Sequence, residues 1–419
     1  MAKFILQGGK KLKGEVSVQG AKNAATPILA ASMLIQGNTI LENIPHILDV
    51  EKTKHILERL GMEIANDFPN NSVQLNAAKV RFRDLDFPEV RQMRSSILLI
   101  GPLLARFGKV KIPHPGGCHI GARPLDTHLD ALQSLGVKVH RDKDYYFLEA
   151  KALRGATVVL EEFSVTATEN LIMAAVLAHG KTVIKLAACE PHVQDLICFL
   201  RKAGAKVKGA GTHTIVIDGV KKLHSVQHKI IPDMIEAGTL IIAGLITGGT
   251  VKVKDLNPTH LEIFLKKLKE MGGRIIVGKD YVQTLPSLRL RSVNIQTLPY
   301  PGFPTDLQAP FAVLLTQSRG TSLIHDPMYE GRLKYLEELK KMGAKIEILD
   351  PHRARISGGV KLRGRKITSL DLRAGATLIL AALAASGRSI IERAEEIDRG
   401  YERIEEKLKS LGAEIKRVE

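Results

Sequence analysis

The chain has 419 residues, of which 44% are apolar and 25% are charged, the balance of a folded globular protein rather than a disordered or fibrous one. This length exceeds the commonest size of a single domain, so two domains are expected. The formal net charge of +17 would suit a nucleic-acid-binding protein, but tryptophan is absent and aromatic residues make up only 4%, which argues against base-stacking platforms. We therefore expect a mildly basic surface and a cleft for small anions, and we keep a nucleic-acid-binding protein as an alternative.

The longest apolar runs, residues 97–105 and 378–385, are much shorter than the roughly 20 residues of a membrane span, so both are predicted to be buried helices. The amino terminus has no apolar run typical of a signal peptide, and the three cysteines have no disulfide-like spacing. These features predict a cytoplasmic protein without a membrane partner. The group Cys189, His192 and Cys198 lacks a fourth ligand, so no metal site is expected, and both cysteines are interpreted as inert side chains in apolar surroundings.

Two strands, residues 4–6 and 15–18, precede any helix and are predicted to form a hairpin. The segment Gly20-Ala21-Lys22-Asn23 then opens the first helix. Free backbone N–H groups and the helix dipole favour an anion at this end, and Lys22 adds a full charge. Many surface helices begin with the same residues, so this segment alone leaves function open.

A repeated unit occupies the rest of the chain. Six times, an amphipathic run ends in a glycine that precedes an alternating strand, which is typical of a helix terminated in the left-handed conformation. These glycines are Gly61, Gly136, Gly204, Gly272, Gly343 and Gly412. An Ala/Leu/Ile-rich helix ends in a second glycine 23 to 28 residues earlier, at Gly37, Gly108, Gly180, Gly249, Gly320 and Gly387. Each unit is thus helix, strand, helix, strand, and recurs about every 70 residues.

Between units lies a two-stranded element, at 214–231 and again at 353–372, but the last unit stops at Glu419 without one. The spare amino-terminal strands can supply it. The sequence therefore predicts an α/β protein with two pseudo-threefold domains, 21–230 and 231–419 completed by 1–20, and a ligand cleft between them.

Residues 115–124 place three glycines, Cys118 and Arg123 in one loop. Glycines allow close backbone approach to a ligand, and nearby positive charge lowers the pKa of a thiol, so Cys118 is a candidate acid, base or nucleophile. Asp306 follows a stiff turn and could equally be a helix cap. The charged run 397–403 could equally be a solvated helix start.

Several strings resemble the UDP-N-acetylglucosamine 1-carboxyvinyltransferase family of enolpyruvyl transferases. They are GAKNA at 20–24, MRSSI at 93–97, PGGCHIGARP at 115–124, FPTD at 303–306, YEGR at 329–332, DLRA at 371–374 and IDRGYERIEEKL at 397–408. The resemblance implies a two-domain inside-out α/β barrel, each domain built from three βαβαββ units. The sister enzymes that make 5-enolpyruvylshikimate 3-phosphate share this fold but lack the cysteine loop, and they remain an alternative.

The resemblance also implies the reaction, in which the 3-hydroxyl of the sugar adds to C2 of phosphoenolpyruvate and phosphate then leaves, a step of peptidoglycan synthesis. Cys118 would protonate C3, Asp306 would accept the hydroxyl proton, and Lys22 and Arg399 would assist catalysis. The cations expected around phosphoenolpyruvate are Lys22, Arg94, Arg123, Arg332, Arg373 and Arg399. The residues expected to bind UDP-N-acetylglucosamine are Asn23, Arg94, Arg123, Pro124, Leu125, Asp126, Thr127, Ser164, Val165, Asp306 and Met328. No metal or organic cofactor is implied.

The sequence departs from the family pattern at four positions. Gly331 replaces the usual Asn, Tyr300 stands where many members have His, and Glu162 and Phe163 differ from the common residues beside the nucleotide. These departures affect the expected nucleotide contacts rather than the reaction. Since Cys118 is present, inactivation by fosfomycin is expected.

Overall fold

The computed structural model describes residues 2–68, 71–114, 116, 121, 124–287 and 289–419. The chain divides into two compact units. We call residues 2–19 and 232–419 the terminal unit, and residues 20–114 and 124–231 the central unit. Each unit encloses an apolar core of its own.

In the terminal unit the strands are β1 (Lys3–Gln7), β2 (Lys13–Ser17), β14 (Thr250–Lys254), β15 (Arg274–Val277), β16 (Tyr281–Leu285), β17 (Ile295–Gln296), β18 (Thr321–His325), β19 (Lys345–Asp350), β20 (Arg353–Ser357), β21 (Lys366–Thr368), β22 (Arg388–Glu392) and β23 (Glu414–Val418). The helices are α8 (Met234–Ile246), α9 (Glu262–Glu270), α10 (Thr305–Gln317), α11 (Tyr335–Lys341), α12 (Leu372–Ala384) and α13 (Ile404–Ser410), with 3-10 turns η3 (Pro258–Leu261), η4 (Arg332–Lys334) and η5 (Ala394–Arg399).

In the central unit the strands are β3 (Ile35–Glu42), β4 (Glu63–Asp67), β5 (Ser72–Asn76), β6 (Lys109–Pro113), β7 (Lys138–Arg141), β8 (Tyr145–Glu149), β9 (Thr157–Val159), β10 (Lys181–Lys185), β11 (Lys206–Lys208), β12 (Thr214–Asp218) and β13 (Leu223–Lys229). The helices are α1 (Lys22–Ala31), α2 (Leu48–Arg59), α3 (Pro88–Gln92), α4 (Ile100–Phe107), α5 (Asp126–Gln133), α6 (Val165–Ala175) and α7 (Pro191–Lys202), with 3-10 turns η1 (Ser32–Leu34) and η2 (Arg94–Leu99).

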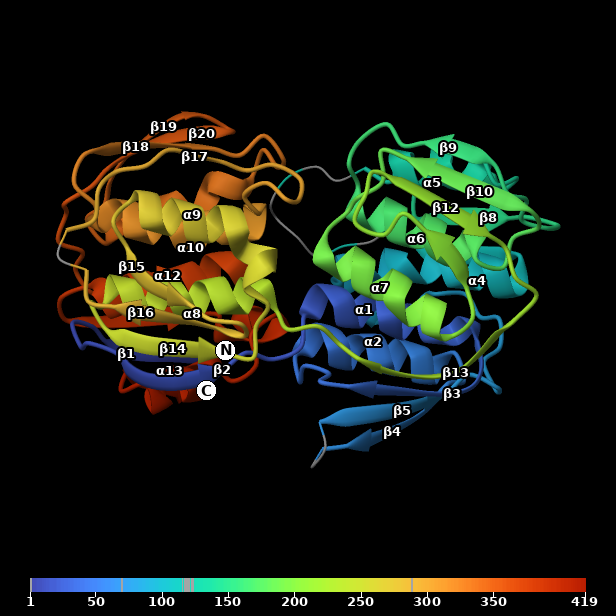
Figure 1. Ribbon diagram of the computed structural model, residues 1–419, viewed down its shortest axis with the longest axis horizontal. Helices are drawn as coiled ribbons and strands as arrows, with labels where there is room; N and C mark the ends of the chain where they lie inside the picture. The colour runs from blue at the N-terminus through green and yellow to red at the C-terminus, as the bar shows by residue number, and fades with distance from the viewer. Residues whose placement is uncertain (1, 69–70, 115, 117–120, 122–123, 288) are drawn as a thin grey trace. The chain divides into compact units, whose positions relative to one another are not determined.

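Helices lie inside each unit and sheets lie outside (Figure 1). In the terminal unit α8, α10 and α12 pack against one another, and sheets β15-β16-β14-β2, β17-β18-β20-β19 and β21-β22-β1-β23 cover them. These three helices are apolar on nearly all sides, as a fully enclosed helix must be. The α/β class and the buried helices predicted at 97–105 and 378–385 are confirmed.

The central unit repeats this plan with sheets β13-β3-β5-β4, β6-β8-β7 and β11-β12-β10-β9. The apolar turn η2 contacts both α1 and α6, and α4 packs on α6. Strand β13 follows β12 in the chain but pairs in parallel with β3 in another sheet, which closes the unit.

The predicted amino-terminal hairpin is wrong. Strand β1 lies between β22 and β23, whereas β2 pairs with β14 in a different sheet. The connection between β1 and β2 makes no tight turn, because the backbone N–H groups of Gly8 and Gly9 bond instead to the end of α12 and the turn after it. The two strands thus complete two sheets of the terminal unit.

The predicted helix-ending glycines adopt the left-handed conformation. All six at the end of the amphipathic helices, from Gly61 to Gly412, have φ between 88° and 102°. The second set has two exceptions: Gly37 lies inside strand β3 rather than at a helix end, and Gly248 instead of Gly249 takes a positive φ, of 61°. A Cβ on Gly249 would meet the carbonyl oxygen of Leu12 at 2.1 Å, so close backbone packing requires glycine there.

Gly412→Ala tests this backbone requirement without a steric clash. An added Cβ has no heavy atom within 4 Å, so only the φ of 94° opposes it. We expect the free energy of unfolding to fall by about 1 to 2 kcal/mol, measured by urea denaturation. Gly412→Asn should cost less, because Asn tolerates this region. Equal stability of Gly412→Ala and wild type would contradict the interpretation.

Helix α6 carries a buried carboxyl group, Glu169. Burial, and secondarily the charge of Glu190, raises the pKa of Glu169 well above its ordinary value. Because the folded state holds this proton more tightly than the unfolded state, its stabilising effect is present below the unfolded pKa of about 4.3 and is lost as pH rises through the folded pKa.

Glu169→Gln removes this titration, so we expect the variant to gain stability over wild type as pH rises from 4 to 8. Urea denaturation across that range measures the gain. The same substitution at exposed Glu149 in the same unit is the control. A gain that is larger at pH 4 than at pH 8 would rule out the explanation.

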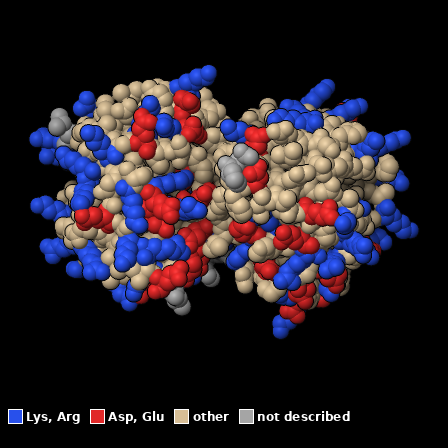
Figure 2. Space-filling view, turned by 90° about the horizontal axis from the view of Figure 1, so that it is seen from below, with Lys and Arg blue, Asp and Glu red and all other residues tan. Residues whose placement is uncertain are grey.

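Positive charge on the surface is interspersed with negative charge (Figure 2). Helices α9 and α11 carry the pairs Lys267–Glu270, Lys340–Glu337 and Lys341–Glu338, so these exposed lysines are balanced by neighbouring carboxylates. In the described part of the chain, no helix is both long enough and apolar enough for a membrane span.

Candidate active site

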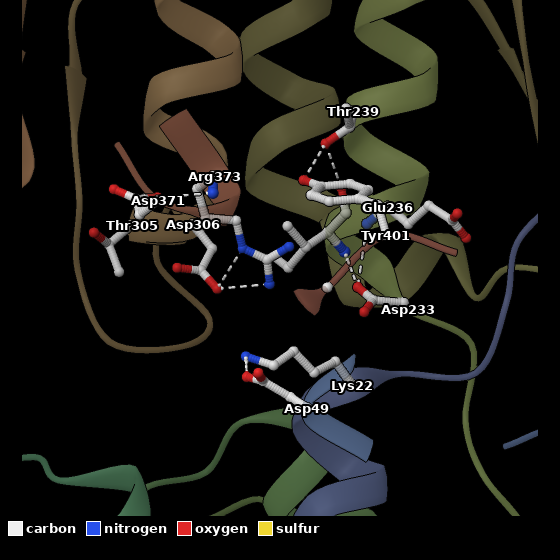
Figure 3. A network of polar contacts seen from close by, with 12 residues as sticks. Lys22, Asp49, Asp233, Glu236, Thr239, Thr305, Asp306, Asp371, Arg373 and Tyr401 are labelled. Atoms are coloured by element: carbon white, nitrogen blue, oxygen red, sulfur yellow. Dashed lines mark hydrogen bonds and ion pairs between the residues drawn. The ribbon is translucent and has the colours of Figure 1, made fainter. Parts of the chain in front are cut away.

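In the terminal unit, Asp306 lies between two buried arginines. Its Oδ2 accepts hydrogen bonds from Nε and Nη2 of Arg373 at 3.1 and 3.0 Å, and its Oδ1 accepts from Nη2 of Arg332 (Figure 3 shows the Arg373 contact). The arginine side chains are only 4% and 5% exposed, whereas Asp306 is 27% exposed. Helix α10 begins after Pro304 without a side-chain cap, so the carboxylate of Asp306 holds arginines instead of capping the helix.

Local structure fixes each arginine. Arg373 lies in the first turn of α12, where the N-cap Asp371 accepts from its backbone N–H at 2.8 Å. Arg332 opens η4 and donates to the carbonyl of Thr305 at 3.2 Å. The hydroxyl of Thr305 in turn donates to buried Asp326 at 2.7 Å.

In this cluster two buried guanidiniums meet the carboxylate of Asp306, and Asp371 and Asp326 add negative charge nearby. Burial opposes the charge of Arg332 and Arg373, but Asp306 and other nearby ionisable groups outweigh it and hold the pKa of both guanidiniums above the ordinary value. Both stay charged at any working pH. A further anion 4 Å from one guanidinium would gain about 4 kcal/mol at an effective dielectric constant near 20, so the cluster suits an anionic ligand.

Arg399 lies at the end of η5 in the same unit and pairs with Glu396 at 3.2 Å. The next residues are held by buried Gln19, whose side-chain amide donates to the Gly400 carbonyl at 3.3 Å and accepts from the Glu402 N–H at 3.0 Å. Gln19 therefore anchors the loop that follows Arg399.

In the central unit, Lys22 is the first residue of α1, as predicted, and Asn23 follows it. The ammonium of Lys22 lies 2.9 Å from Asp49, which is 2% exposed in the first turn of α2. Sequence reasoning missed Asp49. No local pattern around it signals a buried partner for Lys22.

The residues expected at the UDP-sugar gather at two helix starts of the central unit. Leu125, Asp126 and Thr127 begin α5, and Ser164 caps α6 ahead of Val165 by accepting from the Ala167 N–H at 3.4 Å. The two starts meet where the Thr127 hydroxyl donates to Glu162 at 3.4 Å.

Arg94 opens η2 and donates to the carbonyl of Pro124, two residues before α5, at 3.4 Å. Of the departures, Phe163 stacks obliquely on His213 at 4.8 Å between ring centroids. Gly331 caps η4 with φ of −94°, a conformation open to other residues. In the terminal unit, the Met328 N–H donates to Asp326 at 3.0 Å.

Cys118 and Arg123 lie outside the described residues. Of the other cysteines, Cys189 is buried, and burial raises the pKa of its thiol to about 11, so it stays protonated at neutral pH. Cys198 is exposed, and its predicted apolar surroundings are wrong because α7 turns its other side toward the core. No group of three or more His, Cys, Asp or Glu side chains suited to a metal ion occurs among the described residues.

The chain is similar to known proteins over its full length. A family model described as EPSP synthase (3-phosphoshikimate 1-carboxyvinyltransferase) matches residues 6–408. Proteins named UDP-N-acetylglucosamine 1-carboxyvinyltransferase from Koribacter versatilis (strain Ellin345) and Coxiella burnetii (strain RSA 493 / Nine Mile phase I) are 44% and 45% identical over 420 residues. The alignments cover 100% of this chain, and 97% and 96% of those proteins.

The chain belongs to the UDP-N-acetylglucosamine 1-carboxyvinyltransferase family.

Solved structures agree with this family. The enolpyruvyl transferase NikO from Streptomyces tendae matches with a TM-score of 0.90 at 26% identity, covering 100% of this chain and 99% of that one. EPSP synthase from Acinetobacter baumannii matches with a TM-score of 0.74 at 21% identity and 99% coverage of both chains, which supports the fold alone. The resemblance and the inside-out α/β fold expected for a UDP-N-acetylglucosamine 1-carboxyvinyltransferase are confirmed.

Proposed function

We propose that this chain transfers the enolpyruvyl group of phosphoenolpyruvate to the 3-hydroxyl of UDP-N-acetylglucosamine and releases phosphate, the step that opens peptidoglycan synthesis. The full-length identity of 44 to 45% to enzymes of this name carries the proposal. The two buried guanidiniums beside Asp306 support it, because they suit a small, multiply charged anion. Both substrates are cytoplasmic metabolites, so we expect the enzyme to act in the cytoplasm.

In the proposed reaction the sugar oxygen forms a bond to C2 of phosphoenolpyruvate while Cys118 donates a proton to C3. Asp306 accepts the proton that the hydroxyl loses. The tetrahedral intermediate then returns a proton from C3 to the Cys118 thiolate, the C2–C3 double bond forms again, and the bond from C2 to the phosphate oxygen breaks. Phosphate leaves, and no metal or organic cofactor is needed.

Substrate binding would prepare Asp306 for this task. Arg332 and Arg373 donate to both of its carboxylate oxygens, and hydrogen bonds of this kind favour the charged form over the protonated one. The anionic groups of phosphoenolpyruvate compete for these same guanidiniums. We therefore expect phosphoenolpyruvate to release one carboxylate oxygen toward the sugar hydroxyl.

We assign Cys118, Lys22, Arg94 and Arg123 to the same active site as the Asp306 cluster and Arg399. The starts of α5 and α6, together with Asn23 and Met328, would hold the UDP-sugar. Helix starts suit this role because their free backbone N–H groups attract the diphosphate.

A phosphate-release assay with two acceptors tests the function. With phosphoenolpyruvate, purified protein should release phosphate in the presence of UDP-N-acetylglucosamine and not in the presence of shikimate 3-phosphate. The opposite preference would assign the chain to the sister reaction. No turnover with either acceptor, together with salt-sensitive binding of duplex DNA, would favour the nucleic-acid-binding alternative.

A further inference from the structure

The aromatic ring of Tyr401 packs against Arg373, one of the two arginines that bind Asp306. Tyr401 follows η5 in the terminal unit and is 1% exposed. Its neighbours Gly400 and Glu402 are both anchored by the side chain of Gln19. The loop therefore holds the Tyr401 ring in one place inside the unit.

The ring supports the guanidinium of Arg373. The guanidinium carbon lies 5.4 Å from the centroid of the Tyr401 ring, within the range of a cation–π contact. The Nε and Nη2 edge of the same guanidinium is hydrogen-bonded to Asp306 (Figure 3). The aromatic face and the carboxylate together constrain both the plane and the edge of the guanidinium.

The hydroxyl of Tyr401 is fixed as well. It lies 3.0 Å from Oγ1 of Thr239 on α8. The Thr239 hydroxyl has a single proton, which it donates to the Ile235 carbonyl at 2.8 Å. Tyr401 is therefore the donor to Thr239, and burial, which raises the pKa of Tyr401, keeps that proton in place.

We propose that Tyr401, clamped by Thr239, is a positioning residue that holds the guanidinium of Arg373 against Asp306 for enolpyruvyl transfer. This inference rests on the proposed function. It assigns to the tyrosine of the IDRGYERIE string a task apart from contact with substrate. It also explains why a polar aromatic residue occupies this buried position, because phenylalanine could not form the hydrogen bond to Thr239.

Three variants distinguish the contribution of the Tyr401 ring to activity from that of its hydroxyl. Tyr401→Leu removes the aromatic face, and we expect kcat/KM for phosphoenolpyruvate to fall about 30-fold. Tyr401→Phe keeps the ring and removes the hydroxyl, with its contacts to Thr239 and to the Arg373 guanidinium, so a loss of about 5-fold is expected. Thr239→Val should lose no more activity than Tyr401→Phe, and the double variant should be no worse than Tyr401→Phe alone.

Combination with Arg373→Lys distinguishes positioning from general destabilisation. If Tyr401 acts through the guanidinium, Tyr401→Leu should add little to the loss already caused by Arg373→Lys. Tyr281→Leu is the matched control. Tyr281 lies on strand β16, and the ammonium of Lys252 lies 4.6 Å from the centroid of its ring, so this substitution removes a cation–π contact that does not involve Arg373 or Asp306. It should leave kcat/KM unchanged. Wild-type activity of Tyr401→Leu, or the same 30-fold loss in the Arg373→Lys background, would overturn the inference.

Stability tests the inference even if the proposed function is wrong. If wild type releases no phosphate with UDP-N-acetylglucosamine, the proposed function is wrong. Urea denaturation of wild type, Tyr401→Leu, Arg373→Lys and the variant with both changes still measures the coupling between Tyr401 and Arg373. Non-additive losses of stability would support the contact, and strictly additive losses would refute it.

Discussion

Asp306→Asn is expected to lower kcat by about 10²- to 10⁴-fold while phosphoenolpyruvate still binds. Asn has nearly the same size as Asp but cannot accept the hydroxyl proton, which removes the proposed general base. Arg332 and Arg373 remain and lose the carboxylate that competes with the ligand. Phosphate release measures kcat, and calorimetric titration measures binding.

The same substitution should destabilise the free protein. Removing one partner of a buried ion pair leaves uncompensated charge and costs about 3 to 5 kcal/mol. Phosphoenolpyruvate supplies a replacement anion, so it should raise the melting temperature of Asp306→Asn more than that of wild type. Asp350→Asn, which breaks the surface pair with Arg353, is the control and should change neither quantity appreciably. Near-normal turnover of Asp306→Asn would exclude Asp306 as the base.

Cys118→Ala should lower kcat by about 10²- to 10⁴-fold, because it removes the group that we propose protonates C3. Cys118→Asp should retain more activity than Cys118→Ala, since a carboxylic acid can also donate a proton. The phosphate-release assay compares the three proteins at saturating concentrations of both substrates.

Fosfomycin provides an independent measurement. Incubation of wild type with UDP-N-acetylglucosamine and fosfomycin should modify the peptide that contains Cys118, as detected by mass spectrometry. Cys198→Ala is the control, because it removes an exposed thiol on α7 and should leave both turnover and the adduct intact. An unmodified Cys118 peptide, or full activity of Cys118→Ala, would remove this residue from the mechanism.

Much of the fold could be predicted because its signals are local. The six glycines that end the amphipathic helices were recognisable, since the left-handed conformation is a property of a single residue. The inner helices were recognisable from their uninterrupted apolar composition, as in α12. The start of α1 at Lys22 followed from its own segment.

Strand pairing could not be predicted in the same way. Both amino-terminal strands alternate as a hairpin would, yet β1 joins β22 and β23 while β2 joins β14. Alternation shows that a strand has a buried face, but it does not identify the neighbouring strand. Packing around the inner helices decides which partners are adjacent.

The same distinction between local signals and long-range contacts applies to the candidate site. The sequence by itself determined the repeat, the helix ends and the motifs that carry Lys22, Asp306 and Arg373, because these depend on residue types within a few positions of one another. Only the tertiary structure decided that Asp306 holds two arginines instead of capping α10, and that Asp49 and Tyr401 support the cations. Asp306 and Arg373 are 67 positions apart in the chain. Such contacts exist only after the helices have packed, because burial then makes each charge require a partner.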